Sequence, residues 1–160
     1  MADNYGAPPQ RGPAHGRMGI FVGTWHAEGE SYGGPQQDRK NPKAHAERWV
    51  GDEVTEWHPG QFFVVQREDA KVGSGSLITH AVLGYDGTAG HYISHAFENH
   101  GHYRRYIVRG EGNVWTFNGD TERCRLEFSE DGNRQSVSWE WRPVDDAWLP
   151  LCDRVNVRVR

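Results

Sequence analysis

Ten short runs with strand character, separated by turn residues, are the feature that most constrains the fold of this 160-residue chain. Most connectors are short and contain Gly, Asp or Pro, as hairpin loops require. Neighbouring runs are therefore expected to pair as an antiparallel meander. The predicted strands cover residues 23–30, 46–57, 61–68, 76–85, 91–99, 102–109, 113–120, 122–129, 135–142 and 147–160.

Alternation of apolar and polar residues gives the later runs one apolar face each. Trp115 and Phe117 share such a face, as do Val137, Trp139 and Trp141. An open sheet of this many strands would leave two long unpaired edges, and closure removes them. The sequence therefore predicts an all-β fold, an antiparallel up-and-down barrel of about ten strands. A barrel of this size is wide enough to enclose a cavity.

Length, composition and charge limit the domain organisation and the partners. A chain of 160 residues fits one domain, and we expect the barrel to occupy residues 17–160. Residues 1–16 are rich in Pro, Gly and polar groups, so we expect a disordered N-terminal arm there. The net charge of −4 argues against a nucleic-acid partner. Since no apolar segment suits a signal peptide or a membrane span, we expect a cytoplasmic protein without a membrane partner.

The cysteines and tryptophans of the chain are expected to be buried, and the cysteines do not predict a metal-binding module. Cys124 and Cys152 are too few and too far apart for a zinc module, and the cytosol would keep them reduced. Seven tryptophans are many for a chain of this size, so their rings must pack against one another or line a pocket. The oligomeric state, monomer or homodimer, stays open.

The first predicted strand carries the sequence GTWHAEGE at residues 23–30. A Gly and a Trp at this place resemble the first strand of calycin (lipocalin-like) barrels. In those barrels the indole closes one end and packs against an arginine of the last strand. The resemblance gives the closing role to Trp25, and the last strand offers Arg154, Arg158 and Arg160 as its partner. Arg154 and Arg158 would point away from the valine face of a regular strand.

The succession FVGTW, TEWHPGQFFVVQRE and LGYDGTAGHY, between residue 20 and about residue 110, resembles a family of small bacterial calycin-like barrels of unknown function. The same opening is similar to nitrobindin, a haem-binding ten-strand barrel, and more distantly to fatty-acid-binding-protein-like barrels. Nitrobindins supply an axial histidine from near the C-terminus, and this chain has none after His102. We therefore expect no haem and no other cofactor.

Five of the nine histidines lie between residues 79 and 106, which invites an acid–base or metal-binding interpretation. The loop lengths of two hairpins decide which rings share a face. A four-residue loop followed by a two-residue turn groups His80, His95, Arg104 and Tyr106. Two three-residue loops instead group His80, Ser94, Glu98, His102, Arg104 and Tyr106. Both registers unite His80, Arg104 and Tyr106, and we expect their shared face to line the lumen; no metal site is predicted.

Two functions of different classes fit these features. The first is a binding barrel that encloses a small apolar or aromatic molecule. The second is a cofactor-free isomerase, cyclase or lyase acting on a small hydrophobic metabolite, with His80, His95 and Tyr106 as catalytic residues. The predicted ligand-binding residues are Trp57, Arg104, Trp115, Phe117, Trp139 and Trp141.

Overall fold

Each of the ten predicted runs forms a strand in the computed structural model, which describes residues 6–143 and 147–159. Glycines with positive φ occupy the tight turns, for example Gly112 (59°) and Gly132 (71°), where residues with a Cβ are disfavoured. The strands are β1 (Gly23–Ser31), β2 (Glu47–Trp57), β3 (Phe63–Val72), β4 (Gly75–Asp86), β5 (His91–Glu98), β6 (Tyr103–Glu111), β7 (Val114–Asn118), β8 (Glu122–Phe128), β9 (Arg134–Trp141) and β10 (Leu149–Val159).

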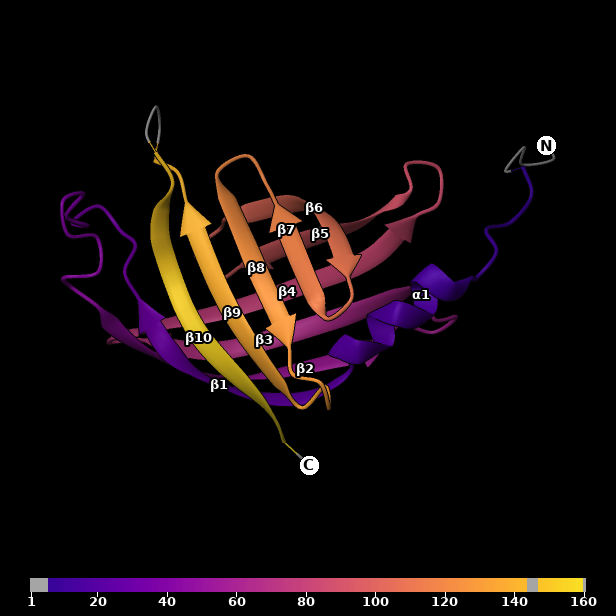
Figure 1. Cartoon of the computed structure of the whole chain (residues 1–160), viewed down its shortest axis with the longest axis horizontal. Coiled ribbons are helices and arrows are strands. Elements are labelled where there is room, and N and C mark those ends of the chain that lie inside the picture. Colours follow the sequence, from indigo (N-terminus) through magenta and orange to yellow (C-terminus); the bar gives the residue numbers. More distant parts are fainter. Residues whose placement is uncertain (1–5, 144–146, 160) are drawn as a thin grey trace.

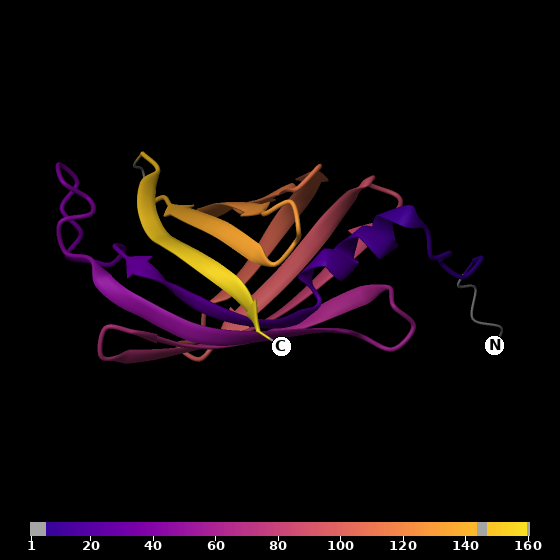
Figure 2. The same ribbon diagram turned by 60° about the horizontal axis from the view of Figure 1, so that its bottom comes forward.

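The strands close into one barrel (Figures 1 and 2). Every strand pairs antiparallel with its neighbours in sequence, and β1 also pairs with β10. This last pairing leaves no open edge. The predicted all-β, ten-stranded up-and-down barrel is confirmed.

The hairpins that carry the histidine cluster have loops of different parity. In the β4–β5 hairpin Val82 pairs with His95, as a four-residue loop requires. In the next hairpin His95 pairs with Arg105, because three residues separate Glu98 from His102. Because one loop has an even number of residues and the other an odd number, even-numbered residues of β4 share a face with odd-numbered residues of β6. His80 and His95 therefore lie on the outer face of the barrel, and their expected place beside Tyr106 in the lumen is wrong.

Two short helical segments cover one end of the barrel, and the loop after β1 lies at the other end (Figure 2). The segments are α1 (Pro13–Arg17) and the 3-10 helix η1 (Met18–Phe21). His15 is buried, and the Tyr92 hydroxyl donates to the Ala14 carbonyl at 2.8 Å. Part of the predicted disordered arm thus packs on the barrel, while its residues 1–5 lie outside the described range. Neither segment has the length and apolar composition that crossing a bilayer would require of a helix.

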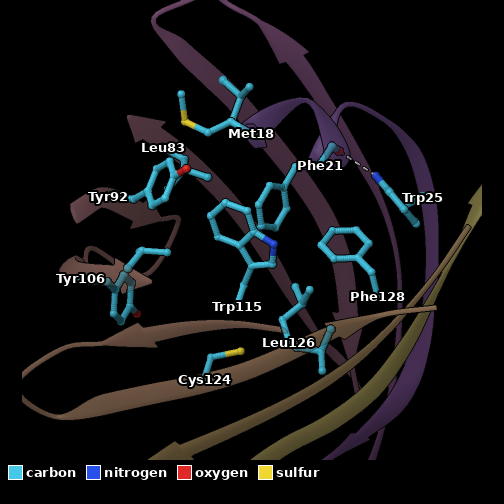
Figure 3. Packing of buried hydrophobic residues seen from close by; sticks show 13 residues of the cluster. Met18, Phe21, Trp25, Leu83, Tyr92, Tyr106, Trp115, Cys124, Leu126 and Phe128 are labelled. Carbon is cyan, nitrogen blue, oxygen red and sulfur yellow. Dashed lines mark hydrogen bonds between the residues drawn. The ribbon is translucent and has the colours of Figure 1, made fainter. Parts of the chain in front are cut away.

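Trp25 closes the end of the barrel beneath η1. Its indole is fully buried, and Nε1 donates to the Phe21 carbonyl at 2.9 Å (Figure 3). The Arg158 guanidinium lies 4.1 Å from the centre of the ring system and donates to the carbonyls of Ile20 and Val22. Among the three candidate arginines of the last strand, the partner of Trp25 is therefore Arg158.

Aromatic residues fill the interior next to this end. Phe21 extends from η1 into the barrel and makes edge contacts with Trp115 and Phe128 at centroid distances of 4.9 and 5.2 Å (Figure 3). Tyr92 packs against the other side of Trp115 at 4.9 Å. This packing fills the lumen at the end that η1 covers.

Candidate functional site

A cavity of about 70 Å³ lies inside the barrel, with room for about two water molecules. Its wall is mixed in character. The apolar lining is formed by Phe21, Val64, Ala81, Leu83, Phe117, Leu126, Val137 and Trp139. The remaining lining residues are Glu53, Thr55, Gln66, Ser94, Cys124, Gln135, Arg154 and Asn156.

Two carboxyl groups face each other inside the barrel. Glu53 on β2 pairs directly with Glu68 on β3, and the two residues are only 3 % and 5 % exposed. Carboxylates in direct cross-strand contact repel each other. Arg154 on β10 reaches this pair, with its Nη1 2.5 Å from Glu68 Oε1. The three side chains form a buried charged cluster, which we call the lumen triad.

Glycine at position 29 allows Arg154 to reach the carboxyl groups. β1 lies between β10 and β2, and Gly29 pairs with Arg154 on one side and with Trp49 on the other. A Cβ at this position would lie 2.6 Å from both Cα and Cβ of Arg154. Without it, the guanidinium extends past β1 and lies 4.8 Å from the centre of the Trp49 ring system. The second glycine of GTWHAEGE therefore has a definite role in the lumen triad.

Glu53 holds its proton at a pH where most carboxyl groups have lost it. Burial and, after it, the neighbouring Glu68 raise the pKa of Glu53 to about 7. Arg154 and a hydrogen bond from the Thr55 hydroxyl, 3.0 Å long, oppose this rise. A carboxyl group with a pKa near neutrality can both donate and accept a proton at physiological pH.

We expect the barrel to lose stability as the pH rises from 5 to 8, and Glu53 to cause much of that loss. The pKa of Glu53 is raised in the folded protein from an ordinary value of 4.5 to about 7. The folded state therefore holds the proton more tightly than the unfolded state. Its contribution is complete below pH 4.5 and disappears as the pH rises through 7. Its size is on the order of 3 kcal/mol.

The Glu53→Gln variant isolates this contribution. A neutral amide cannot lose a proton, so the variant should show a flatter dependence of the unfolding free energy on pH and should be more stable than the wild type at pH 8. Urea unfolding of both proteins at several pH values from 5 to 8 measures the difference. Parallel curves for the two proteins would show that Glu53 does not titrate in this range.

Several buried polar atoms around the cavity have no hydrogen-bond partner among the described residues. Three of them belong to residues that line the cavity: Gln135 Nε2, Arg154 Nε and Asn156 Oδ1. Buried polar atoms in native proteins are nearly always paired. These atoms, all from β9 and β10, therefore mark the part of the wall where polar atoms of a ligand can bind.

Two of the six predicted ligand-binding residues, Phe117 and Trp139, line the cavity. Trp115 is buried in the aromatic packing beneath η1. Trp57 lies at the same end, with Arg11 over its ring at 5.4 Å. Trp141 lies toward the opposite end, where its Nε1 donates to Gln37 Oε1 at 2.7 Å. The aromatic residues thus divide between the cavity wall and the two ends of the barrel.

Arg104 and Tyr106 point inward, but both bind Glu122. The Tyr106 hydroxyl donates to Glu122 Oε2 at 2.9 Å, and Arg104 Nε donates to Glu122 Oε1 at 3.1 Å. Burial and the nearby Glu122 carboxylate raise the pKa of Tyr106, so its hydroxyl keeps its proton at neutral pH. The Tyr106 ring lies behind Phe117 and Trp139, in contact with both.

The two predicted catalytic histidines make contacts on the outer surface. The His80 ring packs against Phe97 at 6.1 Å, and His95 Nδ1 lies 2.5 Å from the Tyr103 hydroxyl. Within residues 6–143 and 147–159, no group of three or more His, Cys, Asp or Glu residues is arranged to hold a metal ion. Cys124 and Cys152 are buried free thiols, and burial raises the pKa of Cys152 to about 11.

The residues that dominate the cavity wall were not predicted as site residues. Glu53 shares the parity of Trp49 and Trp57, so a carboxylate on a strand face that also carries two tryptophans was the available signal. The sequence placed Arg154 on the face of the last strand opposite to the valines. Its partner could not be inferred locally, because Glu68 lies 86 residues away in sequence.

By sequence, the chain matches no family model and no curated protein. The crystal structure of Rv2717c from M. tuberculosis is similar, with a TM-score of 0.67 and 14 % identity over 94 % of this chain and 100 % of that chain. The S-type phycobiliprotein lyase CPES from Guillardia theta gives a TM-score of 0.48 and 12 % identity over 95 % of this chain and 99 % of that chain. The likeness to Rv2717c shows that the two chains share a barrel fold. The calycin-like family suggested by the sequence stays a prediction.

Proposed function

We propose that the protein binds a small molecule inside the barrel and that the polar wall of the cavity orients it. The observation that carries this proposal is the set of unpaired buried polar atoms on β9 and β10, which belong to residues that line a partly apolar cavity. Ligand sites typically combine apolar walls with a few convergent polar groups. The lumen triad and these atoms supply such groups.

The size of the cavity limits the ligand. A volume of about 70 Å³ is far below the several hundred Å³ of a site for a drug-sized molecule. The ligand should therefore be compact, with an apolar side against Leu83, Leu126 and Phe117. It should also carry at least one polar group, because a purely apolar molecule would leave the atoms on β9 and β10 unpaired.

Nuclear magnetic resonance screening tests this proposal directly. We expect compact compounds from a fragment collection to shift backbone amide resonances of inward-facing residues of the ¹⁵N-labelled protein. Ala81→Leu should abolish these shifts by filling the cavity, since Ala81 is part of its wall. Val82→Leu is the matched control, because Val82 is the next residue and points outward. Shifts confined to the outer face, or shifts that persist in Ala81→Leu, would contradict binding in the lumen.

Glu53 favours a second candidate, a cofactor-free enzyme that moves a proton on the bound molecule, as an isomerase, cyclase or lyase does. Its carboxyl group lines the cavity and has a pKa of about 7, so it can take a proton from a ligand and return it. This assigns the acid–base role to Glu53 instead of to the outward-facing His80 and His95.

Exchange of ligand hydrogens in deuterated water separates the two candidates. For a compound that binds in the lumen, an enzyme should catalyse exchange of an acidic C–H, and Glu53→Gln should stop the exchange without abolishing binding. A simple binding protein should give the slow exchange of the free compound with either variant. Mass spectrometry of the recovered compound measures the result.

A further inference from the structure

We infer that Gln135 and Asn156 select a neutral ligand that carries a hydrogen-bond donor and an acceptor on one edge, as a lactam or a primary amide does. This inference rests on the proposed function of the lumen as a ligand site. It deepens that function by assigning a ligand class and the residues that recognise it.

The two side chains form a hydrogen-bonded amide pair on adjacent strands. Gln135 on β9 lies directly opposite Asn156 on β10, and both residues are 1 % exposed. Asn156 Nδ2 donates to Gln135 Oε1 at 2.9 Å. Gln135 Nε2 and Asn156 Oδ1 then remain without a partner in the described part of the chain, although both residues line the cavity.

The pair offers the same chemistry whichever way its amides are turned. Each amide has an oxygen that accepts and a nitrogen that donates. If both groups were rotated by half a turn, Gln135 would donate to Asn156, and the free atoms would be the Asn156 nitrogen and the Gln135 oxygen. Either arrangement leaves one donor and one acceptor on the two hydrogen-bonded amides. A ligand edge with the complementary acceptor and donor satisfies both.

The cross-strand neighbours of the pair explain why its free atoms have no hydrogen-bond partner among the adjacent side chains. Phe128 is the cross-strand neighbour of Gln135 on β8, and Ala27 is the neighbour of Asn156 on β1. Neither side chain can form a hydrogen bond with an amide. The free atoms are therefore flanked by apolar groups within the wall, and the cavity is the side from which a polar partner can approach.

The charges in the lumen favour a neutral ligand over a carboxylate. The Arg154 guanidinium already forms an ion pair with Glu68, and Glu53 is a second carboxyl group on the cavity wall. An anionic ligand would approach these carboxyl groups without a free cation among the lining residues to offset them. A carboxylate offers two acceptors and a negative charge, whereas a lactam or a primary amide offers one donor and one acceptor and carries no charge.

Three compounds with three non-hydrogen atoms each, small enough for a cavity of about 70 Å³, test the inference. Formamide has N–H and C=O on one edge, acetonitrile has only an acceptor, and formate has two acceptors and a negative charge. We expect formamide to shift the side-chain amide resonances of both Gln135 and Asn156 and to bind about ten-fold more tightly than either of the other compounds. Titration of the ¹⁵N-labelled protein measures the three dissociation constants.

Asn156→Leu should remove the preference for formamide, whereas Ser136→Ala, on the outward face of β9, should keep it. If Asn156→Leu fails to fold, the relative affinities of the three compounds for the wild-type protein still test the inference. Equal lumen binding of the three would overturn the amide-pair inference and leave the proposed function intact. Lumen binding of none of them would also overturn the inference. The proposed function would fail only if the wider fragment collection gave no lumen shifts either.

Discussion

Replacing Arg154 by methionine should lower the free energy of unfolding by about 3–5 kcal/mol at pH 8. The substitution keeps the length and apolar stem of the side chain but removes the cation 2.5 Å from Glu68. Glu53 and Glu68 would then lie opposite each other on adjacent strands, buried and without a positive charge to offset theirs. Removing one partner of a buried ion pair is costly because the remaining charge stays out of water. Guanidinium chloride unfolding measures the loss.

Arg125→Met provides the control for this experiment. Arg125 also pairs with a glutamate, Glu127, at 2.7 Å, but its side chain is 57 % exposed. Loss of such a surface pair should change stability by roughly 0–1 kcal/mol. The triple variant Glu53→Gln, Glu68→Gln, Arg154→Met should recover much of the stability, since no uncompensated charge remains. Equal effects of Arg154→Met and Arg125→Met would show that the lumen triad does not behave as a buried charged cluster.

Trp25→Ala should destabilise the barrel by about 3–5 kcal/mol, the range for truncating a large buried aromatic side chain. The indole is fully buried, donates to the Phe21 carbonyl and lies under the Arg158 guanidinium. Its loss would open a cavity beneath η1 and remove one of the contacts that hold this segment. The shift of the denaturant midpoint, at a constant m-value, measures the effect.

Two further variants serve as comparisons for Trp25→Ala. Trp25→Phe keeps a ring in place but loses the indole N–H, so its loss should be smaller than that of Trp25→Ala. Phe97→Ala truncates an aromatic side chain that is 48 % exposed and should cost much less. A Trp25→Ala midpoint no lower than that of Phe97→Ala would reject the closing role of Trp25.

The strands could be predicted because alternation and turn chemistry are local signals. The clearest difference lies at the β3–β4 hairpin, where both strands extend further than predicted, to Val72 and from Gly75. Here the inward residues are small, as at Ala70, and they alternate with charged residues such as Asp69 and Lys71. This pattern is weaker than the alternation of large apolar side chains in β9, so the sequence suggested a longer loop.

The candidate site was harder to predict because it depends on relationships between distant strands. Arg154 and Arg158 both point inward, and only the pairing of β1 with β10 places Arg158 beside Trp25. The faces of the histidine hairpins depended on two loop lengths, and an error of one residue moves every side chain to the other face. Burial of Glu53 required a cation from the opposite end of the chain, which periodicity cannot reveal.

The pairing of the first strand with the last has a consequence for folding during protein synthesis. Glu68 precedes Arg154 by 86 residues, so at about 5–20 residues per second the growing chain contains both carboxyl groups for roughly 4–17 s before their cation is made. β10 also supplies Asn156 and the Arg158 guanidinium that holds η1. A nascent chain that stalls before this strand is an open sheet with two exposed edges, a form prone to aggregation. Closure of the barrel and the pairing of Glu68 with Arg154 therefore wait until β10 has been made.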